Sequence, residues 1–107
     1  MGKVMPLGSL TFWIMDATAD DWESLDQIQP VVDKWWESTQ RLVVAEEIVR
    51  LVQTGLFEEM PHQDRGNDEL SAAAIVADPM RFWFRMTAKG RGQWELESST
   101  IKLPDEA

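Results

Sequence analysis

The sequence predicts an α+β fold with a helical N-terminal half, two or three short strands and a short closing helix. One observation is an apolar face at helical spacing in the segment that ends at Gly55: Val44, Ile48, Leu51 and Val52. Another is an alternation of apolar side chains with cationic or Trp side chains: Phe82, Phe84 and Met86 against Arg81, Trp83 and Arg85. We therefore expect a helix that ends at Gly55 and, after it, a half-buried strand over residues 81–86.

The length of the chain bounds its organisation. Its 107 residues suffice for one hydrophobic core and are too few for two ordinary domains. We expect one domain over residues 1–107, with a core at about 9–97 and a tail at 98–107. The sequence has no apolar run near the ~20 residues that span a bilayer and no secretory leader pattern. We accordingly expect a cytoplasmic protein that does not contact membranes.

Two helices are expected before the helix that ends at Gly55. Ser9 can cap a first helix that is apolar on nearly every side and so is central: Leu10, Phe12, Trp13, Ile14 and Met15. Ser24 and Gln27 have the spacing of a capping box at the start of a second helix. Because proline lacks an N–H and clashes with the preceding turn, this helix either ends near residue 29 or restarts with Pro30 in a first turn.

The C-terminal half is expected to hold the strands. A first strand should cover residues 56–60, and residues 61–79 make a connection longer than a tight hairpin loop. Within that connection, residues 68–77 form either a capped Ala-rich helical turn or an added edge strand, and the sequence leaves both open. Thr87 follows the second strand directly and can cap the closing helix through its hydroxyl.

This order of elements resembles the winged helix-turn-helix family. Residues 47–56, EIVRLVQTGL, resemble the end of that family's recognition helix, where an apolar helix stops at Gly and turns into the wing. Residues 84–91, FRMTAKGR, resemble its strand-to-helix junction. Together with residues 24–28 for the second helix, the resemblance covers roughly residues 9–97. It implies a winged helix, with a three-helix N-terminal half, a two- or three-stranded β-wing and a short C-terminal helix.

The formal net charge of −9 bears on the partner, because a duplex-binding protein gains affinity by neutralising phosphates with Lys and Arg. The recognition-like helix carries Glu46 and Glu47, and only residues 81–94 are basic, through four cations: Arg81, Arg85, Lys89 and Arg91. We therefore expect a non-catalytic regulatory or adaptor module. It should use the winged-helix scaffold to bind a protein partner and itself, as a homo-oligomer.

The family resemblance supports an alternative function, that of a DNA-binding transcriptional regulator, which the net charge disfavours. A dimer could place Arg-bearing patches on one side of the protein and hold its acidic surface away from DNA. The residues that would then lie near the groove are Thr39, Gln40, Arg41, Val43, Glu47 and Arg50. Those that would lie near the DNA backbone are Arg65, Arg81 and Arg85.

Eight side chains are therefore candidates for contact with a partner. Those for a protein or nucleic acid are Arg41, Glu47, Arg50, Arg81, Trp83 and Arg85. The arginines of the second strand have a second interpretation, in which they pair across the strands with Glu58 and Glu59 and stack on Trp83. Trp35 and Trp36 are adjacent on a helix, so at most one can point fully inward, and they are candidate interface aromatics.

The sequence offers little support for catalysis. An acidic group lacks the spacing and the glycine of a calcium loop, and we expect it to supply caps and a solvated turn: Asp16, Asp20, Asp21, Glu23 and Asp26. His62 lies in a polar loop without an orienting partner that the sequence singles out. Cysteine is absent, which excludes disulfides and thiolate metal sites. We expect no enzyme activity, no metal and no cofactor.

Overall fold

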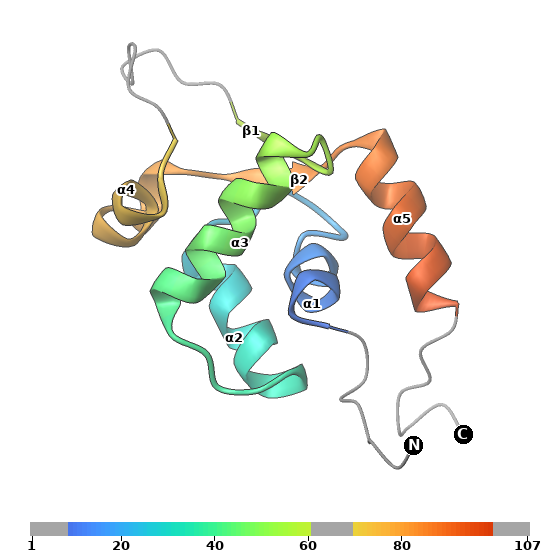
Figure 1. The fold of residues 1–107 in the computed structure, drawn as a ribbon, viewed down its shortest axis with the longest axis horizontal. Coiled ribbons are helices and arrows are strands. Elements are labelled where there is room, and N and C mark those ends of the chain that lie inside the picture. Colours follow the sequence, from blue (N-terminus) through green and yellow to red (C-terminus); the bar gives the residue numbers. More distant parts are fainter. Residues whose placement is uncertain (1–8, 61–69, 100–107) are drawn as a thin grey trace.

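The computed structural model describes residues 9–60 and 70–99. Figure 1 shows the order of the elements: α1 (Leu10–Ala17), α2 (Leu25–Trp35), α3 (Arg41–Gln53), β1 (Phe57–Glu59), α4 (Ala72–Ala77), the 3-10 helix η2 (Pro79–Arg81), β2 (Phe84–Met86) and α5 (Ala88–Ser98). The predicted α+β class is confirmed. The difference from the expected order is that a helix and a 3-10 turn lie between the two strands.

Helix α1 lies at the centre of the fold. It packs against α2, α3 and α5, and Figure 1 shows it between the other N-terminal helices and α5. Ser9 caps it as predicted, because the Ser9 hydroxyl accepts a hydrogen bond of 3.0 Å from the N–H of Phe12. Four consecutive side chains of this helix are buried: Phe12, Trp13, Ile14 and Met15. A helix that is buried on every side explains why its sequence shows no polar face.

Helix α2 runs without interruption through Pro30, so both alternatives for a break at this residue were wrong. The capping box at its start is confirmed, with the N–H of Ser24 donating to the Gln27 side chain at 2.9 Å. Three side chains at helical spacing are completely buried: Leu25, Ile28 and Val32. Pro30 is exposed. Burial of the apolar face outweighs the local cost of proline, and solvent can hydrate the carbonyl that the missing N–H leaves without a helical donor.

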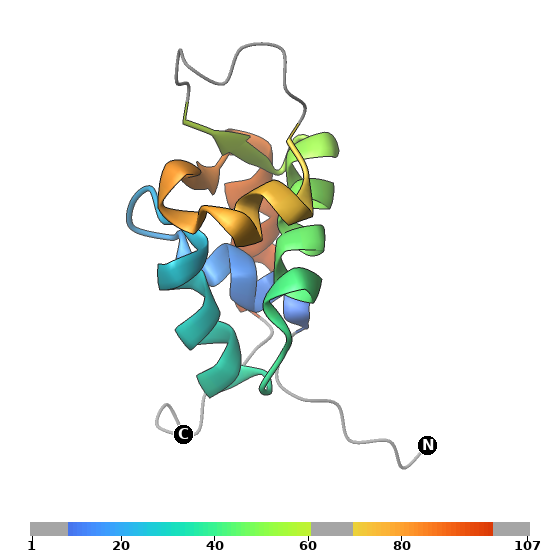
Figure 2. The same cartoon turned by 90° about the vertical axis from the view of Figure 1, so that its left-hand side faces the viewer.

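Helix α3 ends as predicted. Gly55 adopts a φ of 83°, a left-handed conformation that other residues resist. The buried face of the helix comprises Val44, Ala45, Ile48 and Leu51. The helical interpretation of the long connection is correct for α4, which Ser71 caps and which packs on α3, while η2 packs on α2 (Figure 2). Residues 61–69 lie outside the described part.

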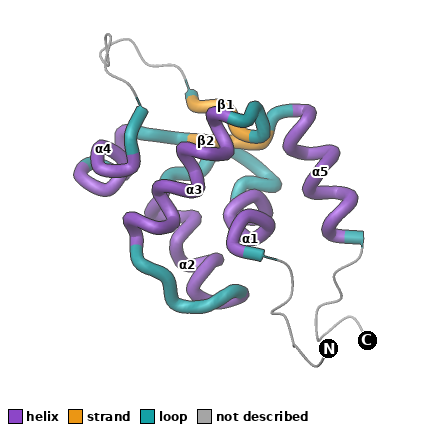
Figure 3. Tube along the Cα trace, viewed as in Figure 1, coloured by secondary structure: helices purple, strands orange, loops and turns teal. Residues whose placement is uncertain are grey.

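The two strands lie side by side as a small antiparallel sheet (Figure 3). Phe57 pairs with Met86, and Glu58 with Arg85. A single bridge adds Glu23, whose N–H and C=O each bond to Phe84 at 2.9 Å. The strand expected over residues 81–86 is shorter at its start. Pro79 presets the φ of a helical turn, so Arg81 belongs to η2 and only residues 84–86 form β2.

Helix α5 is seated against the turn that follows α3. The Thr87 hydroxyl accepts the N–H of Gly90 at 3.0 Å and donates to the carbonyl of Gly55 at 2.6 Å. The predicted cap is therefore confirmed, and it joins α5 to the end of α3. In the part of the chain that the structure describes, no helix has both the length and the apolar character needed to cross a membrane.

Candidate functional site

Both cations of α3 are bound by carboxylates. Nη2 of Arg41 lies 2.6 Å from Oδ1 of Asp26 in α2. Nε of Arg50 donates to Oε1 of Glu47 at 2.9 Å, and the same carboxylate also accepts the hydroxyl of Thr11. The arginines that would have to approach phosphates in the recognition-like helix are thus already neutralised within the protein.

Glu47 is held in its ionised form. Burial raises the pKa of its carboxyl, but hydrogen bonds from Arg50 and Thr11 outweigh the burial, so the pKa is lowered overall. Because Glu47 and Arg50 neutralise each other, this pair offers a phosphate no net attraction.

The solvent side of α3 also carries apolar side chains. Leu42 is 46% exposed and Val43 is 39% exposed. The two residues before α3 have structural roles. Gln40 is the N-cap of α3. Thr39 is bonded to α2, because its N–H donates to Asp33 at 3.1 Å and its carbonyl accepts from Gln29 at 2.6 Å. The residues expected near a DNA groove therefore form a mixture of apolar and internally bonded groups.

The predicted row of Arg81, Trp83 and Arg85 divides into two parts. Arg81 lies in η2, with its guanidinium 5.9 Å from the centre of the Phe82 ring, so it does not share the strand face. Arg85 does lie on the strand, and its Nε donates to Oε2 of Glu58 at 2.8 Å. The predicted cross-strand ion pair is confirmed for these two residues.

The aromatic partner of Arg85 differs from the prediction. Its guanidinium lies 4.4 Å from the ring centre of Trp22, a residue of the loop between α1 and α2, and not over Trp83. The Glu23–Phe84 bridge brings Trp22 beside Arg85. Trp83 instead donates its indole N–H to the carbonyl of Met80 at 2.7 Å. Sequence reasoning missed Trp22 because a one-residue bridge has no periodicity to detect.

We call Trp22, Glu58, Met80, Trp83 and Arg85 the outer sheet face. Burial alternates along the second strand and the residues before it, so the buried Phe82, Phe84 and Met86 lie on the opposite side of the sheet. Met80 lies in η2, just before the strand, and borders this face because its carbonyl accepts the indole N–H of Trp83. Its sulfur lies 3.8 Å from the buried hydroxyl of Ser24, and the residue is 53% exposed. The outer sheet face thus combines two half-buried indoles, a thioether and one ion pair.

The adjacent tryptophans Trp35 and Trp36 lie at the end of α2. Both are half-buried and pack against the core. The Trp35 ring stacks on that of the buried Trp13, with centres 5.7 Å apart and planes at 17°. Neither indole points fully inward or fully outward, and their role as interface aromatics stays a prediction.

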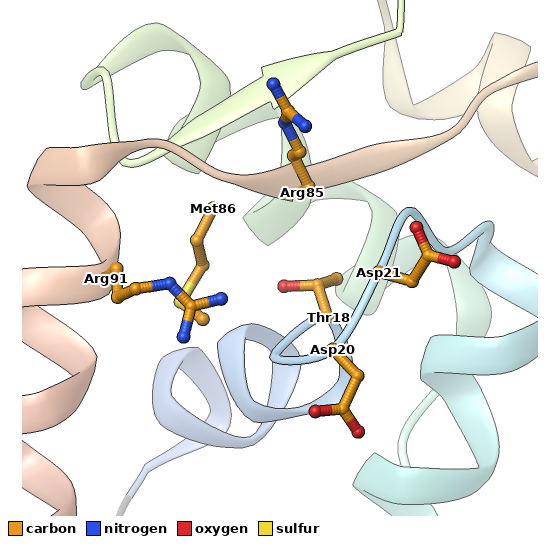
Figure 4. Close-up of a pocket in the computed structure, with 6 residues that line it drawn as sticks. All are labelled: Thr18, Asp20, Asp21, Arg85, Met86 and Arg91. Carbon is orange, nitrogen blue, oxygen red and sulfur yellow. The ribbon is translucent and has the colours of Figure 1, made fainter.

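A small pocket of about 150 Å³ lies beside the sheet (Figure 4), lined by Thr18, Asp20, Asp21, Arg85, Met86 and Arg91. Figure 4 shows the Arg91 guanidinium pointing into this pocket and the Arg85 side chain pointing away from Thr18. Arg91 already donates to the carbonyl of Ala19 at 2.6 Å. The charges of the two arginines and two aspartates that line the pocket cancel, so the lining does not select an anionic or a cationic ligand.

The acidic group has structural partners. Asp21 accepts the N–H of Trp22 at 2.7 Å, Asp26 pairs with Arg41, and Asp16 accepts a hydrogen bond from α5. Among residues 9–60 and 70–99, no cluster of three or more His, Cys, Asp or Glu could hold a metal ion. His62 and Arg65 lie outside the described residues.

Comparison of the chain with protein-family models, with curated proteins and with solved structures finds no match.

Proposed function

We propose that this chain is a non-catalytic regulatory or adaptor module on a winged-helix-like scaffold, and that it binds proteins, including a second copy of itself. The observation that carries the proposal is the state of the recognition-like helix α3. Arg41 and Arg50 are each held by a carboxylate, whereas Leu42 and Val43 are exposed on the same helix. Such a surface suits contact with a protein better than contact with a phosphate backbone.

Net charge supports the same choice. A chain of formal charge −9 gains little or nothing from counterion release, which supplies most non-specific affinity for duplex DNA. A protein partner does not depend on this term, because apolar and aromatic groups supply most of the affinity at the centre of a protein interface. The half-buried indoles and exposed apolar side chains of this chain are groups of that kind.

Two measurements on the purified chain test the proposal. Sedimentation equilibrium over a wide concentration range should give a mass that rises with concentration toward that of a dimer. Fluorescence anisotropy with a mixed-sequence duplex should show no binding even at low salt, where electrostatic attraction to DNA is strongest.

A strictly monomeric chain that binds duplex DNA would replace this proposal with that of a DNA-binding transcriptional regulator. The control is the triple variant R41E/R81E/R85E, which reverses three candidate contact arginines, one each in α3, η2 and β2. Binding that weakens steeply with salt and disappears in this variant would assign the affinity to these arginines.

A further inference from the structure

Arg85 is held in one orientation on the outer sheet face. Glu58 accepts its Nε at 2.8 Å on one side, and Trp22 lies under its guanidinium at 4.4 Å on the other. The Arg85 and Glu58 side chains nevertheless remain 50% and 43% exposed. A guanidinium has five N–H donors in a planar fork, and these two contacts leave part of that fork open to solvent.

Largely apolar side chains flank this ion pair on the outer sheet face. Trp22 and Trp83 are half-buried, and Met80 is more than half exposed at the end of the face. Aromatic residues, Met and Arg are the types that are enriched in protein interfaces. Two tryptophans, a methionine and an arginine on one face therefore suit a contact surface better than an ordinary solvated surface.

The charge of the outer sheet face differs from that of the whole molecule. Two chains of formal charge −9 repel each other over most of their surfaces. The outer sheet face carries one positive and one negative side chain, and the pocket beside it adds Asp20, Asp21 and Arg91, so this region has a formal charge of −1 against −9 for the whole chain. Two copies therefore meet a smaller electrostatic penalty through this face than the charge of the whole chain would impose.

This face is also complementary to itself. In an isologous dimer the same patch is used on both subunits, and a residue that contacts a second residue is contacted by it in return. A two-fold axis between Arg85 and Glu58 would place each arginine opposite the glutamate of the other copy. The four charges would then form two pairs within chains and two pairs between chains.

We propose that the outer sheet face is the contact surface of an isologous homodimer, in which Arg85 of each copy pairs with Glu58 of the other. The inference rests on the proposed function and specifies the surface through which the chain binds itself. Trp22, Met80 and Trp83 supply the apolar contact around the two charge pairs.

The test uses the full chain and two charge reversals, Arg85→Glu and Glu58→Arg. Each variant alone places like charges opposite each other in the dimer, and we expect its dimer dissociation constant to rise about tenfold or more, as for closely opposed like charges. An equal mixture of the two variants should recover the parent's affinity. A chain with two glutamates then faces a chain with two arginines, and this complementarity exists only between molecules.

Two exposed charges of α5, Lys89 and Glu95, provide the control. Lys89→Glu and Glu95→Arg change the net charge by the same amounts as the test variants, and we expect the parent's dissociation constant from both. Circular dichroism melting of every variant verifies that each is folded. Sedimentation equilibrium provides the constants, and labelled chains identify the heterodimer in the mixture.

The outcomes separate the two proposals. Recovery in the mixture with unchanged controls supports the outer sheet face. A parent that dimerises while both test variants retain its affinity, or a mixture that fails to recover, overturns this interface and leaves self-association intact. A parent that is monomeric at every concentration overturns self-association together with the interface.

Discussion

The indole Nε1 of Trp94 in α5 donates a hydrogen bond of 3.1 Å to Oδ1 of Asp16 in α1. Burial raises the pKa of the Asp16 carboxyl, the hydrogen bond from Trp94 lowers it, and the nearby Asp20 raises it again. The result is a pKa above the ordinary value of 3.8. The contact that joins α5 to the central helix therefore contains a carboxylate that folding makes harder to ionise.

We predict that this carboxylate makes stability depend on pH. Because the folded-state pKa of Asp16 is raised, its stabilising contribution is complete below the unfolded value and is lost as pH rises through the folded value. Asp16→Asn keeps an oxygen to accept from Trp94 but cannot ionise. The free energy of unfolding of the parent, measured by urea denaturation relative to this variant, should decrease as pH rises from about 4 to 7. A difference that is constant or that grows over this range would contradict the assignment.

Gly90 allows α5 to approach the turn after α3. A Cβ at this position would lie 2.0 Å from the carbonyl oxygen of Leu56 and 2.9 Å from its carbonyl carbon. Since that carbonyl also accepts the N–H of Thr87 at 3.1 Å, the backbone there is held in place. We expect Gly90→Ala to lower the free energy of unfolding by about 3 kcal/mol in urea denaturation.

The matched control for Gly90 is Gly92 in the same helix. Nothing lies within 4 Å of a Cβ at Gly92. Alanine should therefore express only its better helix propensity, and Gly92→Ala should raise the free energy of unfolding by about 1 kcal/mol. Equal effects at the two glycines would show that α5 does not pack as described.

The Thr87 hydroxyl caps α5 and also bonds to the turn after α3. Thr87→Ala removes both bonds, the acceptance from Gly90 and the donation to Gly55, and should cost about 1–2 kcal/mol of unfolding free energy. Thr87→Ser keeps a hydroxyl in the same place and should lose less than half as much. Thermal denaturation of both variants measures the effects, and an alanine variant as stable as the parent would exclude the role.

Pro30 is the residue of α2 with the lowest intrinsic helix propensity. Alanine at this exposed position restores the N–H that can reach the carbonyl of Asp26 and removes the clash with the preceding turn. We expect Pro30→Ala to raise the free energy of unfolding by roughly 1–3 kcal/mol. The larger conformational entropy of the unfolded alanine variant offsets part of this gain. A loss of stability in urea denaturation would mean that α2 needs the geometry that proline imposes.

Residues with a local chemical signature were predictable. The caps at Ser9, Ser24 and Thr87 and the stop at Gly55 all follow from backbone groups that need a partner within a few residues. The alternation from Phe82 to Met86 likewise identified the buried side of the second strand. These features depend on neighbours in the sequence, so the sequence is sufficient to find them.

Features that depend on distant contacts were not predictable. Pro30 stays helical because three buried side chains on the far side of α2 outweigh its local cost. Trp22 meets Arg85 only because the chain forms a single bridge at Glu23. Three of the candidate contact residues, Arg41, Arg50 and Arg85, are each held by a carboxylate, and only for Arg85 could the sequence predict that partner. Where the local sequence pattern allows several partners for a side chain, tertiary packing determines which of them it contacts.

The Glu23–Phe84 bridge also has a consequence for folding kinetics. The described residues are mostly helical, and helical bundles rich in local contacts fold within microseconds to milliseconds. Here Glu23, before α2, pairs with Phe84 of β2, and Asp16 of α1 bonds to Trp94 of α5. The chain must therefore close two long loops before these contacts can stabilise it. We therefore expect the folding rate of this domain to be limited by the search for these two junctions and to resemble that of a mixed α/β domain.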